Sequence, residues 1–304
     1  MYSDWNDGRA HGAPDSSPNE SNSNESDESG IDAQGATVPD HRGMFTLAEL
    51  TDLNQSTDND PVRPCDIRGI LHSHSNYTDG SHSIAEMAEI AAEIGLEYLG
   101  ISDHFQSSVH RDGLDLEAVC YQRGEVDEIH NKLPHLDLFQ GVEIDAGPQG
   151  QLPLDDETLK VFDFVIVSFP GTVDMTYNER TALVSRIAAH PRVTILGLPV
   201  GDWILRRDDR NLDFEQVLAA AVEGGTAIEV NANPSRLPVD WTMCLRAQEM
   251  GVKMVISPNA HRAARLVDYR HGAQQANTAG LCCGSFLNTL SADELREYLA
   301  RARR

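Results

Sequence analysis

Lysine is nearly absent from this chain of 304 residues. The lysines are Lys132, Lys160 and Lys253, and arginine supplies the other basic side chains. Because 48 acidic residues stand against 24 basic ones, the formal net charge is −24. A field of this sign repels nucleic acid and anionic membranes at low ionic strength. The composition therefore disfavours a protein that binds nucleic acid or membrane surfaces through general electrostatic attraction.

Long apolar runs and paired cysteines are also lacking. No segment approaches 18 consecutive apolar residues, so no membrane-spanning helix is expected. The first residues lack the basic stretch and apolar stretch of a secretory signal. The cysteines form no C-x-x-C pair and are odd in number: Cys65, Cys120, Cys244, Cys282 and Cys283. This usage is typical of reduced thiols rather than of a disulfide framework or a thiolate zinc site, so we expect a cytoplasmic protein.

The first 43 residues differ in composition from the rest of the chain. Residues 15–29 consist almost wholly of Ser, Asn, Asp and Glu and show no apolar periodicity. Such a segment cannot offset its ordering entropy by burial, so residues 1–43 are predicted to be a disordered acidic tail. Residues 44–65 are predicted to form a short helix (44–53) and a polar linker, and residues 66–304 one folded domain.

From Asp66 onward, strand-like apolar runs alternate with amphipathic segments. We expect strands at 67–71, 98–101, 138–144, 164–168, 193–198, 227–231 and 253–257. We expect helices at 84–94, 116–133, 178–189, 214–223 and 241–250, and a last helix after residue 291. The capping boxes Ser83-x-x-Glu86 and Ser291-x-x-Glu294 mark the starts of two of them. Seven alternations in about 240 residues predict a closed α/β barrel rather than an open sheet.

Two histidines close the first expected strand, in the sequence Leu71-His72-Ser73-His74. Histidines two residues apart on a strand point to the same face, so both can bind one cation. Asp79 offers a carboxylate from the loop that follows. Barrel enzymes place their chemistry at the C-terminal ends of the strands. Polar groups end other expected strands as well: Ser102-Asp103-His104, Glu143, Glu229-Val230-Asn231 and Asn259-Ala260-His261.

In this order, the motifs resemble the polymerase and histidinol phosphatase (PHP) domain, in the form found at the C-terminus of bacterial family X DNA polymerases. The likeness runs from about Asp66 to the C-terminus and is carried by residues 66–74, 102–104, 141–145, 229–237 and 287–289. It implies a distorted (β/α)7 barrel that binds up to three divalent metals and hydrolyses phosphoesters, with 3′–5′ exonuclease-type activity in the polymerases. Residues 1–65 are too short for a polymerase core, so we expect a stand-alone PHP domain.

The resemblance also implies the metal ligands. Six residues stand where the family has ligands: His72, His74, Asp79, His104, Glu143 and His261. At three further ligand positions this chain has other residues: Phe169, Leu198 and Asn259. Phe169 and Leu198 carry no atom that can bind a cation, and the amide oxygen of Asn259 is a weaker ligand than a carboxylate.

In the family's arrangement these residues are divided among three ions. The first ion would have three ligands and a weak fourth, a usable catalytic set: His72, His74, Glu143 and Asn259. The second and third ions would keep two ligands each: Glu143 with His104, and Asp79 with His261. We therefore expect fewer than three divalent ions, of Mn, Zn, Mg or Fe. His82 and His110, in loops on the same side, are candidate replacement ligands.

Three hypotheses for the function follow. The first is a metal-dependent phosphoesterase with a reduced metal site, whose catalytic residues would be His72, His74, Glu143 and His104. Its substrate would be a phosphorylated small molecule or a nucleic-acid end, without a role for a membrane. The second is a pseudoenzyme that keeps the barrel as a binding or regulatory module. The third is a changed chemistry, in which the apolar wall near Phe169 and Leu198 selects another substrate. The sequence identifies no protein partner.

Overall fold

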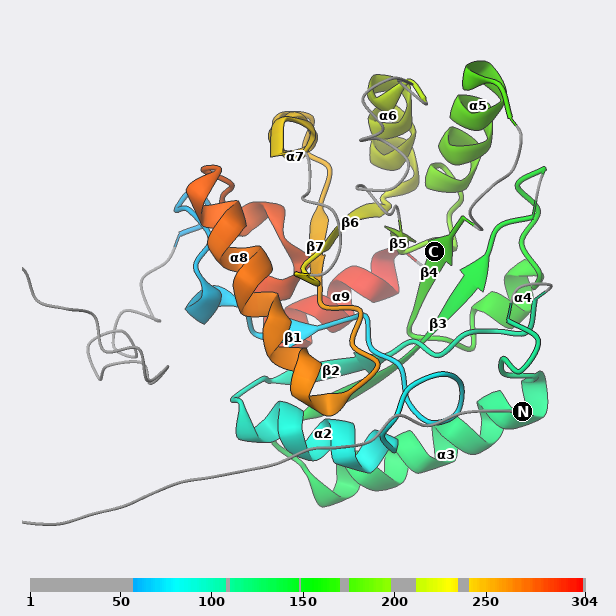
Figure 1. Cartoon of the computed structure of the whole chain (residues 1–304), viewed down its shortest axis with the longest axis vertical. Helices are drawn as coiled ribbons and strands as arrows, with labels where there is room; N and C mark the ends of the chain where they lie inside the picture. Colours follow the sequence, from blue (N-terminus) through cyan, green and yellow to red (C-terminus); the bar gives the residue numbers. More distant parts are fainter. Residues whose placement is uncertain are drawn as a thin grey trace, which may run out of the picture. The chain divides into compact units, whose positions relative to one another are not determined.

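Parallel strands form one seven-stranded sheet, in which each strand pairs with the next one along the chain (Figure 1). The strands are β1 (Gly69–Ile70), β2 (Tyr98–Ile101), β3 (Asp137–Asp145), β4 (Phe164–Ser168), β5 (Ile195–Gly197), β6 (Ala227–Asn231) and β7 (Met254–Ser257). The structure, a computed structural model, describes residues 57–107, 110–147, 149–169, 175–197, 212–234 and 241–302. The predicted distorted (β/α)7 barrel is confirmed. The predicted tail (1–43) and the predicted helix at 44–53 lie outside the described residues.

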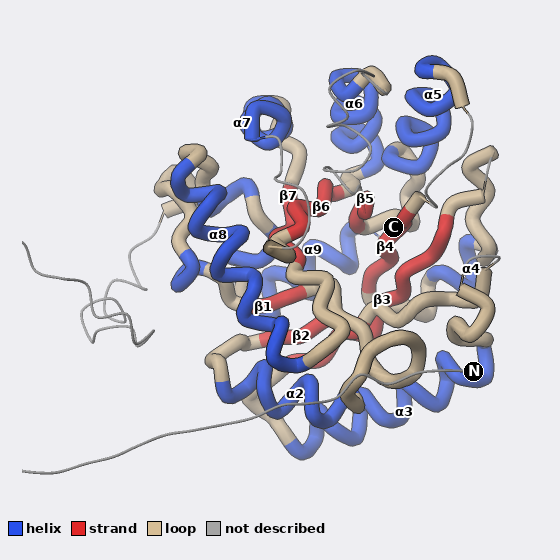
Figure 2. Tube along the Cα trace, viewed as in Figure 1, coloured by secondary structure: helices blue, strands red, loops and turns tan. Residues whose placement is uncertain are grey.

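Helices surround the strands, as Figure 2 shows. They are α2 (Ile84–Glu93), α3 (Leu116–Lys132), α4 (Asp156–Leu159), α5 (Tyr177–Ala188), α6 (Phe214–Gly224), α7 (Trp241–Glu249), α8 (Tyr269–Thr278) and α9 (Ala292–Ala302). Both predicted capping boxes form, at Ser83 with Glu86 and at Ser291 with Glu294. Each such cap stabilises its helix by about 1 kcal/mol. Within the described ranges, no helix is both long and apolar enough to cross a membrane.

The barrel closes between β1 and β7 without a regular ladder among the described residues. Ser73 and Ala260, just beyond the two strands, form an isolated parallel bridge. Farther back along the seam, the buried Asn288 side chain accepts a hydrogen bond from the N–H of Ile256 and donates to the carbonyl oxygens of Ile256 and Gly69. The bridge therefore sets the residues that follow β1 directly beside those that follow β7.

The inside of the barrel consists of an apolar layer and a polar layer. Inward side chains at the beginnings of the strands pack with leucines of α9, which lies behind the strands in Figure 1. This apolar layer includes Tyr98, Phe139, Phe164, Ile195, Ala227, Val255, Leu295 and Leu299. Because side chains alternate along a strand, Glu143, Ser168, Glu229 and Ser257 point to the same side farther along. Polar groups therefore gather at the C-terminal end of the barrel.

Helix α8 was not predicted from the sequence. Its buried face is formed by Tyr269 and by small residues, Gly272, Ala273 and Ala276. A Cβ on Gly272 would lie only 2.6 Å from the Cβ of Ala232, so the absent side chain allows close approach to the barrel. A face of this kind lacks the large apolar residues on which helix prediction from periodicity depends.

The described part of the predicted linker packs against the domain. Val62 is fully buried, and its N–H donates to the carbonyl oxygen of Leu281 over 2.8 Å. Pro61 pairs with Cys282 in an isolated bridge. The folded region therefore begins before Asp66, because the apolar side chain of Val62 is buried in the hydrophobic core.

Candidate metal centre

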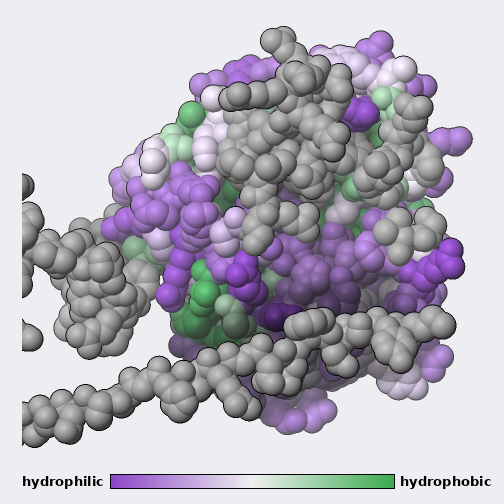
Figure 3. Space-filling model, in the orientation of Figure 1, coloured by the Kyte–Doolittle hydropathy of each residue, from purple (hydrophilic) through white to green (hydrophobic). Residues whose placement is uncertain are grey.

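The predicted ligands come from loops and strand ends on one side of the barrel. His72 and His74 follow β1, His104 follows β2, Glu143 lies in β3 and His261 follows β7. Hydrophilic residues gather at the recessed centre of the face seen in Figure 3. The six predicted ligands fall into two groups that share one histidine: His72, His74 and Glu143, and His74, Asp79, His104 and His261.

The first group brings three buried ligand atoms together. The Nε2 atoms of His72 and His74 lie 3.1 Å apart, and Oε2 of Glu143 lies 3.1 Å from the first and 3.3 Å from the second. Ligand atoms that each stand about 2.1 Å from a tetrahedral ion are about 3.4 Å from one another. The three separations therefore suit one divalent ion held by two imidazoles and a carboxylate.

The charges in this group perturb one another. Burial by itself would lower the pKa of His72, but the neighbouring carboxylates of Glu229 and Glu143 outweigh it and raise that pKa to about 10. Burial would raise the pKa of Glu143, but His72 and His74 outweigh it and hold that pKa well below its usual value. Burial lowers the pKa of His74. The metal-free centre therefore pairs a cationic His72 with an ionised Glu143.

Glu229, which the sequence analysis placed at a strand end without a role, contacts the first group. Nδ1–H of His72 donates to Oε1 of Glu229, and both side chains are buried. This bond fixes the proton on Nδ1 and directs Nε2 toward the first group, as carboxylates do for metal-binding histidines. Ser168 donates its hydroxyl to Oε1 of Glu143, which leaves Oε2 for the group. The alternation of side chains along β6 predicts that Glu229 points into the barrel. Nothing in the sequence predicts that it pairs with His72.

Asn259 has two unusual features at the position where the resemblance implies a fourth ligand. It is the non-glycine residue with a positive φ among the described residues, at 47°. Its Oδ1 atom is buried and has no hydrogen-bond partner within the described part of the chain. A buried acceptor without a partner is costly, and a bound cation would satisfy it. Asn259 therefore fits a weak fourth ligand, and its placement as a ligand stays a prediction.

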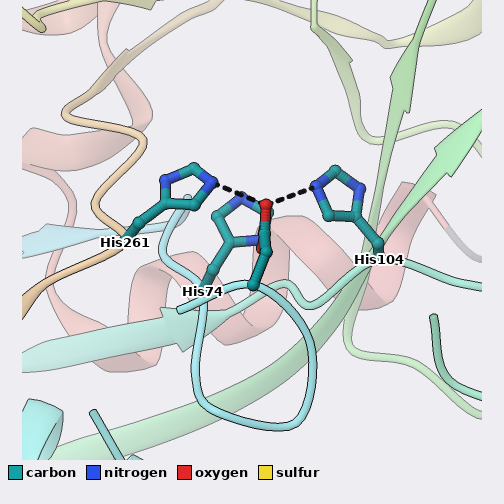
Figure 4. Close-up of side chains that lie close together, drawn as sticks. His74, His104 and His261 are labelled. Atoms are coloured by element: carbon teal, nitrogen blue, oxygen red, sulfur yellow. Dashed lines mark hydrogen bonds and ion pairs between the residues drawn. The ribbon is translucent and has the colours of Figure 1, made fainter. Parts of the chain in front are cut away.

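The three histidines of the second group, labelled in Figure 4, lie around the carboxylate of Asp79. Nε2 of His261 lies 3.1 Å from Oδ2 of Asp79, and Nε2 of His104 lies 3.7 Å from the same oxygen. The ring of His74 stacks between the other two, with centroids 4.3 Å from His261 and 4.7 Å from His104. The imidazoles of His104 and His261 outweigh burial and hold the pKa of Asp79 well below its usual value, and the bond to Asp79 raises the pKa of His261.

Asp103 holds the loop that carries Asp79. Its buried carboxylate accepts hydrogen bonds from the N–H and hydroxyl of Ser75, from the hydroxyl of Thr78 and from the amide of Gln122. Four donors on one carboxylate compensate its burial. The loop therefore has a defined conformation before any ligand binds, and Asp79 is directed toward His104.

The two candidate replacement ligands lie outside both groups. His110 stacks on His104, with ring centroids 3.6 Å apart, and its Nδ1 donates to Oδ2 of Asp145 over 3.0 Å. Nδ1 of His82 accepts a hydrogen bond from the N–H of Ala263 over 3.4 Å. His110 therefore supports the ring of His104, and His82 holds the segment after β7.

The substituted ligand positions differ in what the structure describes. Phe169 follows β4 and is buried, with 5% of its surface exposed. Leu198 lies outside the described residues. An apolar buried side chain at position 169 leaves no donor there for a metal.

Comparison with known proteins places the chain in a family. No family model matches it. The DNA polymerase/3′-5′ exonuclease PolX of Bacillus subtilis is 32% identical over 235 residues, which are 77% of this chain and 41% of that protein. A probable phosphatase of Thermoanaerobacter sp. (strain X514) is 27% identical over 250 residues, 77% of this chain and 96% of that protein. The chain belongs to the PHP superfamily.

A solved PHP structure has the same fold. The histidinol phosphate phosphatase of Lactococcus lactis, in a complex with zinc, L-histidinol and phosphate, superimposes with a TM-score of 0.51 at 15% identity, over 70% of this chain and 94% of that chain. The chain spans only 41% of the length of its PolX relative. The sequence relatives confirm the PHP resemblance predicted from the motifs, and the solved structure confirms the fold.

Proposed function

We propose that this PHP chain is a metal-dependent phosphoesterase that hydrolyses a phosphorylated small molecule. The observation that carries the proposal is the convergence of Nε2 of His72, Nε2 of His74 and Oε2 of Glu143 at separations of 3.1 to 3.3 Å. Imidazole and carboxylate together suit zinc, manganese or iron. A divalent ion held there would lower the pKa of a water and offset negative charge on a phosphate oxygen.

Neighbouring side chains orient the ligands of the first group, and one side of the group is open to solvent. Glu229 orients His72, and Ser168 orients Glu143. The side chains of Asp79 and His261 are 47% and 37% exposed, whereas those of the first group are buried. A substrate phosphate would therefore approach from the side of Asp79 and His261.

Two facts favour a small substrate over nucleic acid. The net charge of −24 opposes binding of a polyanion. The match to the probable phosphatase covers 96% of that protein, whereas the match to PolX covers 41%. Hydrolysis of a nucleic-acid end is the alternative, and the assay below distinguishes the two classes of substrate.

The test is hydrolysis by the full chain, stripped with chelator and resupplied with Mn²⁺ or Zn²⁺. Three substrates are compared: p-nitrophenyl phosphate, bis-p-nitrophenyl phosphate and a 3′-labelled oligonucleotide. We expect metal-dependent release of phosphate from the monoester, reduced by about 100-fold or more in His72→Ala. His135→Ala, an exposed histidine outside the centre, is the matched control and should retain activity. Metal-independent hydrolysis, or equal activity in His72→Ala, would contradict the proposal.

The buried Phe169 favours a second candidate, a pseudoenzyme that uses the barrel for binding. Its side chain occupies a position where the family resemblance implies a metal-binding histidine. This candidate predicts that the metal-loaded protein hydrolyses none of the three substrates. Metal-dependent turnover of any of them that is lost in His72→Ala would exclude it.

A further inference from the structure

Two of the ions that the resemblance implies would keep two ligands each, and such pairs bind weakly. The structure brings members of both pairs together. Asp79, His104, His261 and His74 offer ligand atoms that all lie within 4.8 Å of one another. His104 follows β2 and His261 follows β7, as labelled in Figure 4, and one oxygen of Asp79 faces both imidazoles.

We infer that Asp79, His104 and His261 form a single second cation site, in place of two incomplete ones. Oδ2 of Asp79 lies 3.1 Å from Nε2 of His261 and 3.7 Å from Nε2 of His104. These distances lie on either side of the roughly 3.4 Å expected between ligands of a tetrahedral ion. Three protein ligands leave a position for water or for a substrate oxygen.

The hydrogen bond of His261 and the ring stack on His104 orient both imidazoles for metal binding. Nδ1–H of His261 donates to the carbonyl oxygen of Asn259 over 3.1 Å, so Nε2 is the nitrogen that a cation can take, in place of the proton that bonds it to Asp79. A metal-binding histidine is usually held in this way through its other nitrogen. The ring of His104 is held by the stacked ring of His110, which Asp145 anchors. Both imidazoles are therefore oriented by groups outside the site.

His74 joins the second site to the first. Its Nε2 belongs to the first group, so a metal-binding tautomer carries its proton on Nδ1. Nδ1 is buried, has no hydrogen-bond partner among the described residues and lies 3.5 Å from Oδ1 of Asp79. Asp79 thus faces His74 with one oxygen and the proposed cation with the other. One carboxylate would orient a ligand of the first ion and bind the second.

The site takes a divalent ion of the zinc, manganese or iron class, because its ligands are two imidazoles and one carboxylate. Asp79 and His261 are partly exposed, so a phosphate oxygen can reach the open position. The role of this ion in hydrolysis, as the second member of a two-ion clamp, rests on the proposed function. The binding of the ion does not rest on it.

The experiment counts ions. Chelator-treated full chain is titrated with Zn²⁺ by calorimetry, and bound zinc is measured by elemental analysis after gel filtration. We expect two ions per wild-type chain and one in His104→Ala, in His261→Ala and in the double variant His104→Ala/His261→Ala. His72→Ala should keep the second ion, and His135→Ala should keep both.

The double variant distinguishes one site from two. If His104 and His261 served different ions, their joint removal would release more zinc than either substitution alone, which would overturn the inference. One ion, or three ions, on the wild type would overturn it as well, and this result does not depend on any variant folding. Two ions without hydrolysis would contradict the proposed function and leave the site intact. Hydrolysis by a chain that binds only one ion would support the proposed function and overturn the second cation site.

Discussion

Binding of an ion in the first group should release a proton from His72. In the metal-free protein, burial is outweighed by the carboxylates of Glu229 and Glu143, which raise the pKa of His72 to about 10. Nε2 must lose its proton before it can bind a cation. The metal-free state therefore holds more protons than the bound state, and a rise in pH favours binding.

The size of the effect follows from that pKa. One displaced proton changes the affinity about tenfold for each pH unit below the pKa, which equals about 1.4 kcal/mol. Between about pH 6.5 and about pH 8.5 the affinity for the first ion should therefore rise about 100-fold. Glu229→Gln removes one of the two charges and should shift the pKa of His72 back toward its ordinary value of about 6.5.

Calorimetry in buffers of different ionisation enthalpy measures the number of protons that are released when one ion binds. Mn²⁺ is titrated into His261→Ala, in which the first ion is isolated, near neutral pH. We expect about one proton released per ion, and much less than one when Glu229→Gln is added. The control His135→Ala in the same background should release the same proton. An affinity that is independent of pH, with no proton released, would refute this account of the centre.

Three further predictions concern other residues. Asn259→Asp should tighten the first ion by about tenfold, because a carboxylate replaces a neutral oxygen; unchanged affinity in a zinc titration would show that position 259 is no ligand. Asn288→Ala should lower the free energy of unfolding by about 3 kcal/mol, because backbone groups at the barrel seam lose their partners; a loss below about 1 kcal/mol in urea unfolding would contradict this. Cys283 should react with alkylating agents far more slowly than the exposed Cys120, because burial and a nearby carboxylate raise its pKa to about 12; equal labelling by mass spectrometry would disagree.

The local parts of the fold could be predicted from the sequence. The strands at 98–101, 164–168 and 227–231 coincide with β2, β4 and β6, because apolar runs between turn signals depend on neighbouring residues alone. The capping boxes at Ser83 and Ser291 mark helix starts for the same reason. Helix α8 escaped prediction because its buried face is built from Gly272 and two alanines.

The candidate ligands could be named from the sequence, but only part of their grouping could. The family resemblance implied that His72, His74 and Glu143 share one ion, and their ligand atoms lie close together in the structure. The junction of Asp79 with His104 depends on a loop conformation that buried hydrogen bonds impose, and no periodicity in the sequence reports it. Glu229 and His72 stand 157 residues apart, so their contact became visible only with the closed barrel.

The most direct test of the central claim is the metal content of the full chain, purified without chelator and measured by elemental analysis. The account predicts at least one tightly held divalent ion per wild-type chain, and its loss in the folded variant His72→Ala/His74→Ala. A well-folded wild-type protein without bound metal would contradict a metal-dependent phosphoesterase and favour a barrel kept for binding.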